Sequence, residues 1–232
     1  MTIYIGHLYY DLMNLYGEIG NIKALKYSLE NAGVKVVIDN LSINDDIDFS
    51  KYDILYIGSG TENNELIVLN DIKKYKNELK KYIEDNKFVI ATGNSIELFG
   101  KTIFNKKEYK ALNIFDYSSK LIDKRIVGDI IIPMKNVNKD IIGFQNRSSI
   151  IENNNCPLFD SDYTLGINYK NFYGTYILGP ILVRNPELNK YLINKLLKSK
   201  NKKFKPKNID LNLDKKAYTS YLKTYYNSTL GK

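Results

Sequence analysis

The 232-residue chain contains one cysteine, one histidine and no tryptophan. A single cysteine, Cys156, excludes an internal disulfide, and together with the lone His7 it is too little for a Cys/His zinc site. No tight acidic motif indicates another metal, so we expect neither a metal nor a cofactor. No apolar run approaches the roughly 20 residues of a membrane span, and the N-terminus lacks the pattern of a secretory signal. These absences predict a cytoplasmic protein without membrane insertion.

Basic residues are in excess, and the formal net charge is +8. The lysines are spread through helical segments and the C-terminal part, and the 20 tyrosines are scattered without the aromatic motif of an RNA-recognition sheet. A diffuse basic surface most often serves solubility or weak steering. We therefore predict that the chain does not bind nucleic acid.

Hydrophobic patterning predicts an α/β fold. In the first half, apolar strands alternate with amphipathic helices, which is typical of a mostly parallel sheet with helices on both faces. The pattern of the second half predicts further strands, which should form an antiparallel extension or join the sheet. A helix after Asn185 and a last helix are predicted to follow them. We expect one domain over residues 1–232. The predicted first-half strands are 2–8, 34–39, 53–60 and 88–91, the helices between them centre on 22–32 and 69–83, and the second-half strands lie within 125–134, 140–151 and 162–179.

The segment KFVIATGNSIELFG, residues 87–100, has the local pattern of a nucleophile elbow. A short apolar strand turns sharply and enters a predicted helix, a shape that presents a catalytic Ser or Cys at the end of a parallel strand. The residue at the tip is Gly93. The predicted elbow therefore lacks a nucleophile.

A second turn, IGSGTENNE at residues 57–65, ends the preceding strand with Gly58 and Gly60. Two glycines let backbone amides approach an anion closely, although a tight turn without a ligand explains the same pattern. The spacing matches neither a dinucleotide fingerprint nor a P-loop. This turn and the elbow are expected at one rim of the sheet.

Two longer segments, DLMNLYGEIGNI (11–22) and YGTYILGPILVRNP (173–186), are distinctive. With the elbow, GFQNR (143–147) and FKPKNID (204–210), they resemble the small, glutaminase subunits of lipid II isoglutaminyl synthase, within the cobyric-acid-synthase-like class I glutamine amidotransferases. The resemblance implies a class I glutamine-amidotransferase-like fold. In that family the small subunit hydrolyses glutamine and passes ammonia to a Mur-ligase-like, ATP-dependent synthetase that amidates a peptidoglycan precursor.

The same resemblance implies that the catalytic groups have been replaced. The family's nucleophilic Cys falls on Gly93 and its basic His on Leu178, and the Arg that helps to hold glutamine falls on Ile150. At the elbow, the second Gly and the Gln of the family motif become Ser95 and Glu97. Three sites that act as a unit have thus changed, so we predict a pseudoenzyme that binds or regulates a Mur-ligase-like synthetase.

The polar residues within the two long segments are types usually found exposed. If catalysis does not maintain them, contact with a partner protein is the alternative. The predicted partner-binding residues are Asp11, Asn14, Glu18, Asn21, Arg184 and Asn185.

Two alternatives remain open. One is an active amidohydrolase that uses Ser95 as nucleophile and His7 as base. The other is a small-ligand binder that retains the glutamine cleft for another anion or amide, with Arg147 in place of the missing Arg. The residues predicted for such a cleft are Gly58, Gly60, Asn94, Asn146 and Arg147.

Overall fold

A six-stranded sheet forms the centre of the computed structural model, which describes residues 1–207 and 209–229. All its neighbouring strands pair in parallel except β9, which runs antiparallel at one edge. The inner strands β3 and β4 are buried along their whole length, which explains their uninterrupted apolar sequences. In spatial order the strands are β2 (Lys35–Leu41), β1 (Thr2–Leu8), β3 (Ile54–Ile57), β4 (Phe88–Thr92), β10 (Phe172–Thr175) and β9 (Gly166–Tyr169).

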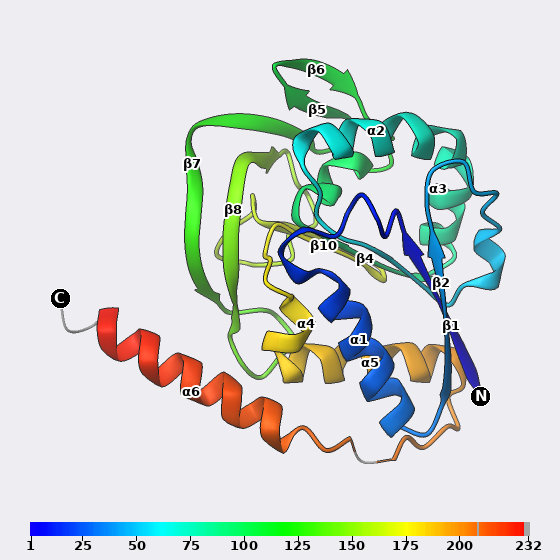
Figure 1. Ribbon diagram of the computed structural model, residues 1–232, viewed down its shortest axis with the longest axis vertical. Coiled ribbons are helices and arrows are strands. Elements are labelled where there is room, and N and C mark those ends of the chain that lie inside the picture. The colour runs from blue at the N-terminus through cyan, green and yellow to red at the C-terminus, as the bar shows by residue number, and fades with distance from the viewer. Residues whose placement is uncertain (208, 230–232) are drawn as a thin grey trace.

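Helices cover both faces of this sheet. Figure 1 shows α1 (Ile19–Asn31) and α5 (Pro186–Lys200) on one side, with α2 (Glu62–Ile72) and α3 (Lys76–Glu84) on the other. The predicted α/β class with a mostly parallel sheet is confirmed. The single helix expected around 69–83 is wrong, because a 3-10 turn at Lys73–Tyr75 separates α2 from α3 and brings the Tyr75 ring edge-on to Phe49, 5.3 Å between centroids.

The predicted antiparallel extension is a separate two-stranded ribbon. It consists of β7 (Ser118–Ile132) and β8 (Ile141–Glu152), whose register shifts between Leu121 and Ile126. The backbones of Phe144 in β8 and Leu178 exchange two hydrogen bonds, of 3.2 and 2.8 Å, which attach the ribbon beside the end of β10. A small hairpin of β5 (Thr102–Asn105) and β6 (Lys107–Lys110) was not predicted.

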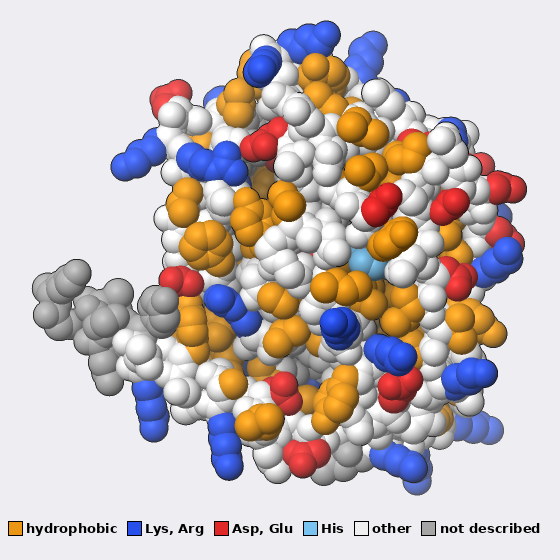
Figure 2. Space-filling model, in the orientation of Figure 1, with side chains coloured by type: hydrophobic (Ala, Val, Ile, Leu, Met, Phe, Trp, Pro, Cys, Tyr) orange, Lys and Arg blue, Asp and Glu red, His pale blue; other side chains and the backbone are white. Residues whose placement is uncertain are grey.

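The chain continues through the short α4 (Ile181–Arg184) and ends in α6 (Asn212–Thr229), which extends beyond the body of the molecule in Figure 1. Over the described ranges 1–207 and 209–229, no helix combines the length and apolarity that a membrane crossing requires. On the face in Figure 2, Lys and Arg side chains are dispersed and interspersed with Asp and Glu. The excess basic charge does not gather into one patch on this face.

Candidate functional site

A cleft of about 490 Å³ opens where β3 and β4 end, between the start of α2 and the β7–β8 ribbon. Carboxyl ends of neighbouring parallel strands meet at one edge of a sheet, which is where such folds place their ligand sites. The cleft brings together seven residues singled out from the sequence: Gly60, Gly93, Asn94, Glu97, Asn146, Arg147 and Leu178.

Gly93 forms the sharp turn directly after β4. Its φ of +65° lies in the left-handed region, as an elbow tip requires, and the following segment Gly93–Phe99 is a 3-10 helix. A Cβ added at Gly93 would lie 2.8 Å from Leu178 Cδ2 and closer still to the side chain of Ser59. Ser59 and Leu178 therefore fill the space that a nucleophile's Cβ would occupy.

Ser95 and His7 are not arranged as a nucleophile and its base. Ser95 is fully buried, and its hydroxyl donates to the carbonyls of Ile57 (3.1 Å) and Thr92 (2.9 Å). His7 is also fully buried, edge-on to Tyr56 at 5.5 Å between ring centroids, and burial lowers its pKa to about 4. Both side chains are structural in this arrangement.

Asn94, beside the tip, connects the two turns of the rim. Its Oδ1 accepts from the Gly60 amide (3.0 Å) and from the Ser59 hydroxyl (3.2 Å), and its Nδ2 donates to Glu65 Oε2 (3.2 Å). The Gly60 amide, expected to face an anion, is thus already satisfied within the protein. Gly58 does not line the cleft: its Cβ position is blocked by the Met13 carbonyl and the Glu18 side chain.

The Arg147 guanidinium is buried at the wall of the cleft, and each of its three nitrogens has a protein partner. Its Nε donates to Gln145 Oε1 (2.9 Å), one terminal nitrogen donates to the Thr164 carbonyl (3.2 Å), and the other lies 3.9 Å from Asp162. The guanidinium also lies over the Tyr176 ring, 4.9 Å from its centroid. Arg147 is therefore not free to bind an anion as the missing family Arg would.

Two buried carboxylates, Glu65 and Glu97, line the same cleft. Glu97 accepts a hydrogen bond from Ser149, and burial raises its pKa. Burial and the nearby Glu97 carboxylate raise the pKa of Glu65 well above its usual range. Sequence reasoning noted Glu97 as the position of a family Gln but missed Glu65, although the spacing of Glu65, Leu69 and Ile72 places this carboxylate on the buried face of α2.

Five of the six predicted partner-binding residues separate into two groups. Asp11 and Asn14 are exposed, whereas Glu18, Asn21 and Asn185 are at most 2% exposed, so their predicted contact with a partner is wrong. Glu18 accepts from Tyr56, Thr92 and Asn21, and the Asn21 Oδ1 accepts from the Leu182 amide (2.8 Å). These polar residues bond one another where α1, the elbow strand and α4 meet, although Glu18 Oε1 has no hydrogen-bond partner among the described residues.

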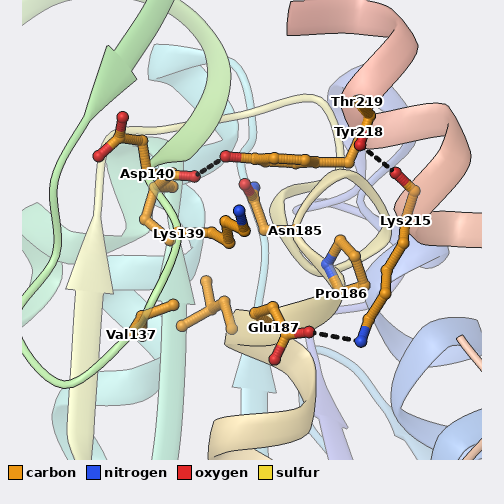
Figure 3. A pocket seen from close by; sticks show the side chains of 11 residues that line it. Val137, Lys139, Asp140, Asn185, Pro186, Glu187, Lys215, Tyr218 and Thr219 are labelled. Carbon is orange, nitrogen blue, oxygen red and sulfur yellow. Dashed lines mark hydrogen bonds and ion pairs between the residues drawn. The ribbon is translucent and has the colours of Figure 1, made fainter.

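Asn185 lines a second, smaller pocket of about 190 Å³, shown in Figure 3. Its side chain bonds both the amide (2.8 Å) and the carbonyl (2.7 Å) of Ile142, which ties α5 to the ribbon. Across the pocket, the Tyr218 hydroxyl donates to the Asp140 carbonyl (2.8 Å) and Lys215 pairs with Glu187 (2.8 Å). Arg184 is half-buried, 3.8 Å from Asp129 and over the Tyr221 ring. This region fastens α6 to the body.

Comparison with known sequences places this arrangement in a family. A profile of the CobB/CobQ-like glutamine amidotransferase domain matches residues 4–186. The chain belongs to this family. It is 32% identical over 221 residues to a Staphylococcus aureus protein, "Lipid II isoglutaminyl synthase (glutamine-hydrolyzing) subunit GatD", covering 90% of both chains. The Streptococcus pneumoniae protein of the same name is 32% identical over 210 residues, covering 84% of this chain and 81% of that one.

Solved structures agree on the fold of this CobB/CobQ-like chain. A crystal structure of a glutamine amidotransferase superimposes with a TM-score of 0.57 over 83% of this chain and 98% of the other, at 13% identity. A glutamine amidotransferase from Thermotoga maritima gives a TM-score of 0.56 over 86% of both chains, at 10% identity. The predicted class I glutamine-amidotransferase fold is confirmed.

No other chemistry-bearing cluster stands out in the described part of the chain. Within it, no group of three or more His, Cys, Asp or Glu side chains is placed to hold a metal ion. Cys156 lines a different pocket, with Asn154 and Tyr117 among its neighbours. The thiol of this chain thus lies outside the cleft that contains Gly93.

Proposed function

We propose that this chain is a glutaminase-like subunit that no longer hydrolyses glutamine and that binds, and thereby regulates, an amide-forming synthetase in the cytoplasm. The observation that carries the proposal is the filled space at Gly93, where Ser59 and Leu178 leave no room for a thiol. Covalent glutamine hydrolysis needs a nucleophile with a base in reach. Among the described residues, the cleft lining contains neither a cysteine nor a histidine.

The names of its relatives support the partner half of this proposal. Both are described as subunits of lipid II isoglutaminyl synthase, and the family resemblance implies a Mur-ligase-like synthetase as the other subunit. Asp11 and Asn14 remain exposed on the loop between β1 and α1, together with Tyr10 and Tyr16. This loop is the surface through which we expect the synthetase to bind, across an interface of roughly 1,200 to 2,000 Å².

The proposed loss of glutamine hydrolysis is tested by measuring ammonia release from glutamine. Wild-type protein and the Gly93→Cys variant are both expected to show none above a protein-free control, because neither has a base at Leu178. Glutamine turnover by the wild type that Ser95→Ala or His7→Ala abolishes would overturn the proposal in favour of an active amidohydrolase. Turnover gained by Gly93→Cys alone would show that another group accepts the proton.

The proposed binding of a synthetase is tested by co-expression with the candidate synthetase. The wild-type chain is expected to co-purify with it, and Asp11→Lys is expected to weaken the complex by roughly 1 kcal/mol or more. Glu78→Lys, a charge reversal at an exposed site on α3, is the matched control and is expected to bind as wild type does. Failure of the wild-type pair to co-purify would remove the partner proposal.

The cleft itself supports a second role, which is binding of a small ligand. Its volume of about 490 Å³ lies within the range of small-molecule sites. One of its buried polar atoms, Glu65 Oε1, makes no hydrogen bond within the described part of the protein.

A further inference from the structure

The connection between α5 and α6 carries a dense run of positive charge. Its residues 198–207, KSKNKKFKPK, include six lysines and no acidic side chain. All six lysines are exposed. Blocks of five or six like charges repel one another and often form interaction segments. The folded protein therefore either neutralises this run or leaves it available to an external partner.

Only one of the six lysines is neutralised within the described part of the chain. Lys200 pairs with Asp53, whose side chain is 4% exposed. The next acidic side chain along the chain, Asp210, accepts the Asn212 amide (2.9 Å) at the start of α6. The remaining five lysines, here called the lysine surface, form no ion pair with any described residue: Lys198, Lys202, Lys203, Lys205 and Lys207.

The backbone of the connection is anchored to the body of the protein. The Phe204 side chain packs against the hydrophobic core, and its amide donates to the Asn201 carbonyl (3.0 Å). The Lys207 amide donates to the carbonyl of Ala32 at the end of α1 (3.1 Å). Anchoring reduces the entropy that is lost when several side chains of one segment bind together. The lysine surface is thus prepared for a partner that contacts many of its charges at once.

The lysine surface lies at the amino ends of the parallel strands. Asp53, the partner of Lys200, directly precedes β3, and Ala32 lies shortly before β2. Figure 1 shows the connection along the end of the molecule where the N-terminus lies. The cleft and the loop with Asp11 and Asn14 follow the carboxyl ends of the strands. A partner on the lysine surface therefore leaves the cleft and this loop accessible.

The chemistry of the segment favours a partner that offers only negative charge. Neither the cleft nor the Asn185 pocket is lined by these lysines. Binding of single-stranded nucleic acid relies on rings on which bases stack, whereas Phe204, the one aromatic residue of the segment, packs against the core. An anionic lipid bilayer attracts clusters of about four to eight Lys or Arg through charge alone.

We propose that the lysine surface binds the headgroups of an anionic lipid bilayer electrostatically, without insertion. Each lysine close to such a bilayer strengthens binding roughly five-fold, so the five lysines act together. This surface goes beyond the proposed function and can fail without it. A chain that binds no bilayer can still lack glutaminase activity and still bind a synthetase.

Co-sedimentation with large unilamellar vesicles tests the proposal. At low salt the protein is expected to bind vesicles of mixed phosphatidylglycerol and phosphatidylcholine, and not vesicles of phosphatidylcholine alone. Exposed charges are screened by salt, so about 0.3 M potassium chloride is expected to weaken the binding roughly ten-fold or more. No binding to the anionic vesicles at low salt, or equal binding to both kinds of vesicle, would overturn the proposal.

Two soluble polyanions and phosphates separate a bilayer from other sources of negative charge. Excess glycerol 3-phosphate at matched ionic strength is expected to leave vesicle binding unchanged, because a single headgroup engages few of the lysines. Displacement of the protein by it would overturn the proposal in favour of a site for free phosphate. Poly(U) RNA is expected to bind more weakly than the anionic vesicles at the same salt. Tighter binding of the RNA would assign the surface to nucleic acid instead.

A triple variant locates the binding on the connection. Lys202→Gln, Lys203→Gln and Lys205→Gln together remove three of the five charges and are expected to weaken vesicle binding roughly 50-fold or more. These side chains are exposed, so folding should be preserved, and circular dichroism checks it. Unchanged vesicle binding by the folded triple variant would reject the lysine surface.

A matched triple variant controls for the general basic charge of the chain. Lys106→Gln, Lys107→Gln and Lys110→Gln remove the same net charge from exposed lysines of the β5–β6 hairpin, at the opposite end of the molecule in Figure 1. This variant is expected to bind anionic vesicles within about three-fold of the wild type. Equal weakening by the two triple variants would mean that diffuse charge causes the binding, and it would overturn the proposal.

Discussion

Glu18 is a carboxylate held inside the protein by hydrogen bonds alone. It is fully buried, accepts from Tyr56, Thr92 and Asn21, and forms no ion pair within the described part of the chain. Burial raises its pKa from 4.5 to about 7, against the opposing effect of these three hydrogen bonds. Its place between α1 and the elbow strand makes it a residue on which the geometry of the cleft depends.

Stability should therefore fall as pH rises through the range set by Glu18. The unfolded chain releases this proton near pH 4.5, whereas the folded chain keeps it until about pH 7. Between these values ionisation stabilises the unfolded state but not the folded state. The free energy of unfolding therefore decreases as pH rises and stays low above pH 7. Glu18→Gln removes this titration, and its amide oxygen can still accept two of the three hydrogen bonds.

We expect the wild type to lose roughly 2–3 kcal/mol more than Glu18→Gln between about pH 5 and pH 8. Urea unfolding of both proteins at the two pH values measures the difference. Comparing the pair cancels the other titrating groups, including Glu65 and Glu97. Parallel pH profiles would mean that Glu18 keeps an ordinary pKa in the folded protein.

At the scale of elements, α6 is attached through a short set of contacts near its first half. Tyr218 is 9% exposed and bonds the Asp140 carbonyl, and Lys215 pairs with Glu187 (Figure 3). Tyr221 adds a hydrogen bond to Asp129 (2.6 Å). The helix is joined to α5 by a long connection, so these contacts decide whether it stays docked.

Tyr218→Ala should release α6 while leaving the sheet intact. Loss of a largely buried aromatic ring and its hydrogen bond costs roughly 3 kcal/mol, which weakens the attachment of α6. Limited trypsin digestion should then cleave faster after Lys215 and Lys216. Leu213→Ala is the control, because Leu213 is 80% exposed and its loss removes little packing. Equal cleavage rates for wild type and Tyr218→Ala would show that other contacts hold the helix.

At the scale of the whole molecule, buried side chains form one connected hydrophobic cluster. It contains residues of the sheet, such as Ile3 and Phe88, residues of the ribbon, such as Ile141 and Ile151, and Leu211 just before α6. An element that shares its core with its neighbours cannot unfold without exposing them. We therefore keep the prediction that residues 1–232 form one domain.

A single domain should unfold in one transition. Far-UV circular dichroism reports the helices and sheet, and fluorescence of the 20 tyrosines, undisturbed by tryptophan, reports side-chain packing throughout the chain. The two urea curves should coincide. Separate midpoints would divide the ribbon from the sheet and reject the single-domain prediction.

The fold was largely predictable because local patterns and their tertiary outcome agree. β1, β4 and α5 appear where apolar runs, the elbow turn and the helical pattern after Asn185 predict them. The break between α2 and α3 and the hairpin β5–β6 were not predictable in the same way. The position of Tyr75 against Phe49 depends on a residue 26 positions earlier, and no local spacing reports it.

The site could be predicted from the sequence only in part. Sequence by itself determined that Gly93 and Leu178 stand where a nucleophile and base are expected, because those assignments depend only on residue type and order. Tertiary structure alone decided that Ser59 closes the space at Gly93, that Arg147 is already engaged, and that Glu65 and Glu97 share one buried cleft. The reason is physical: whether a polar group is free depends on which distant donors and acceptors folding brings within hydrogen-bond distance of it, and burial, which shifts its pKa, exists only once the chain has packed.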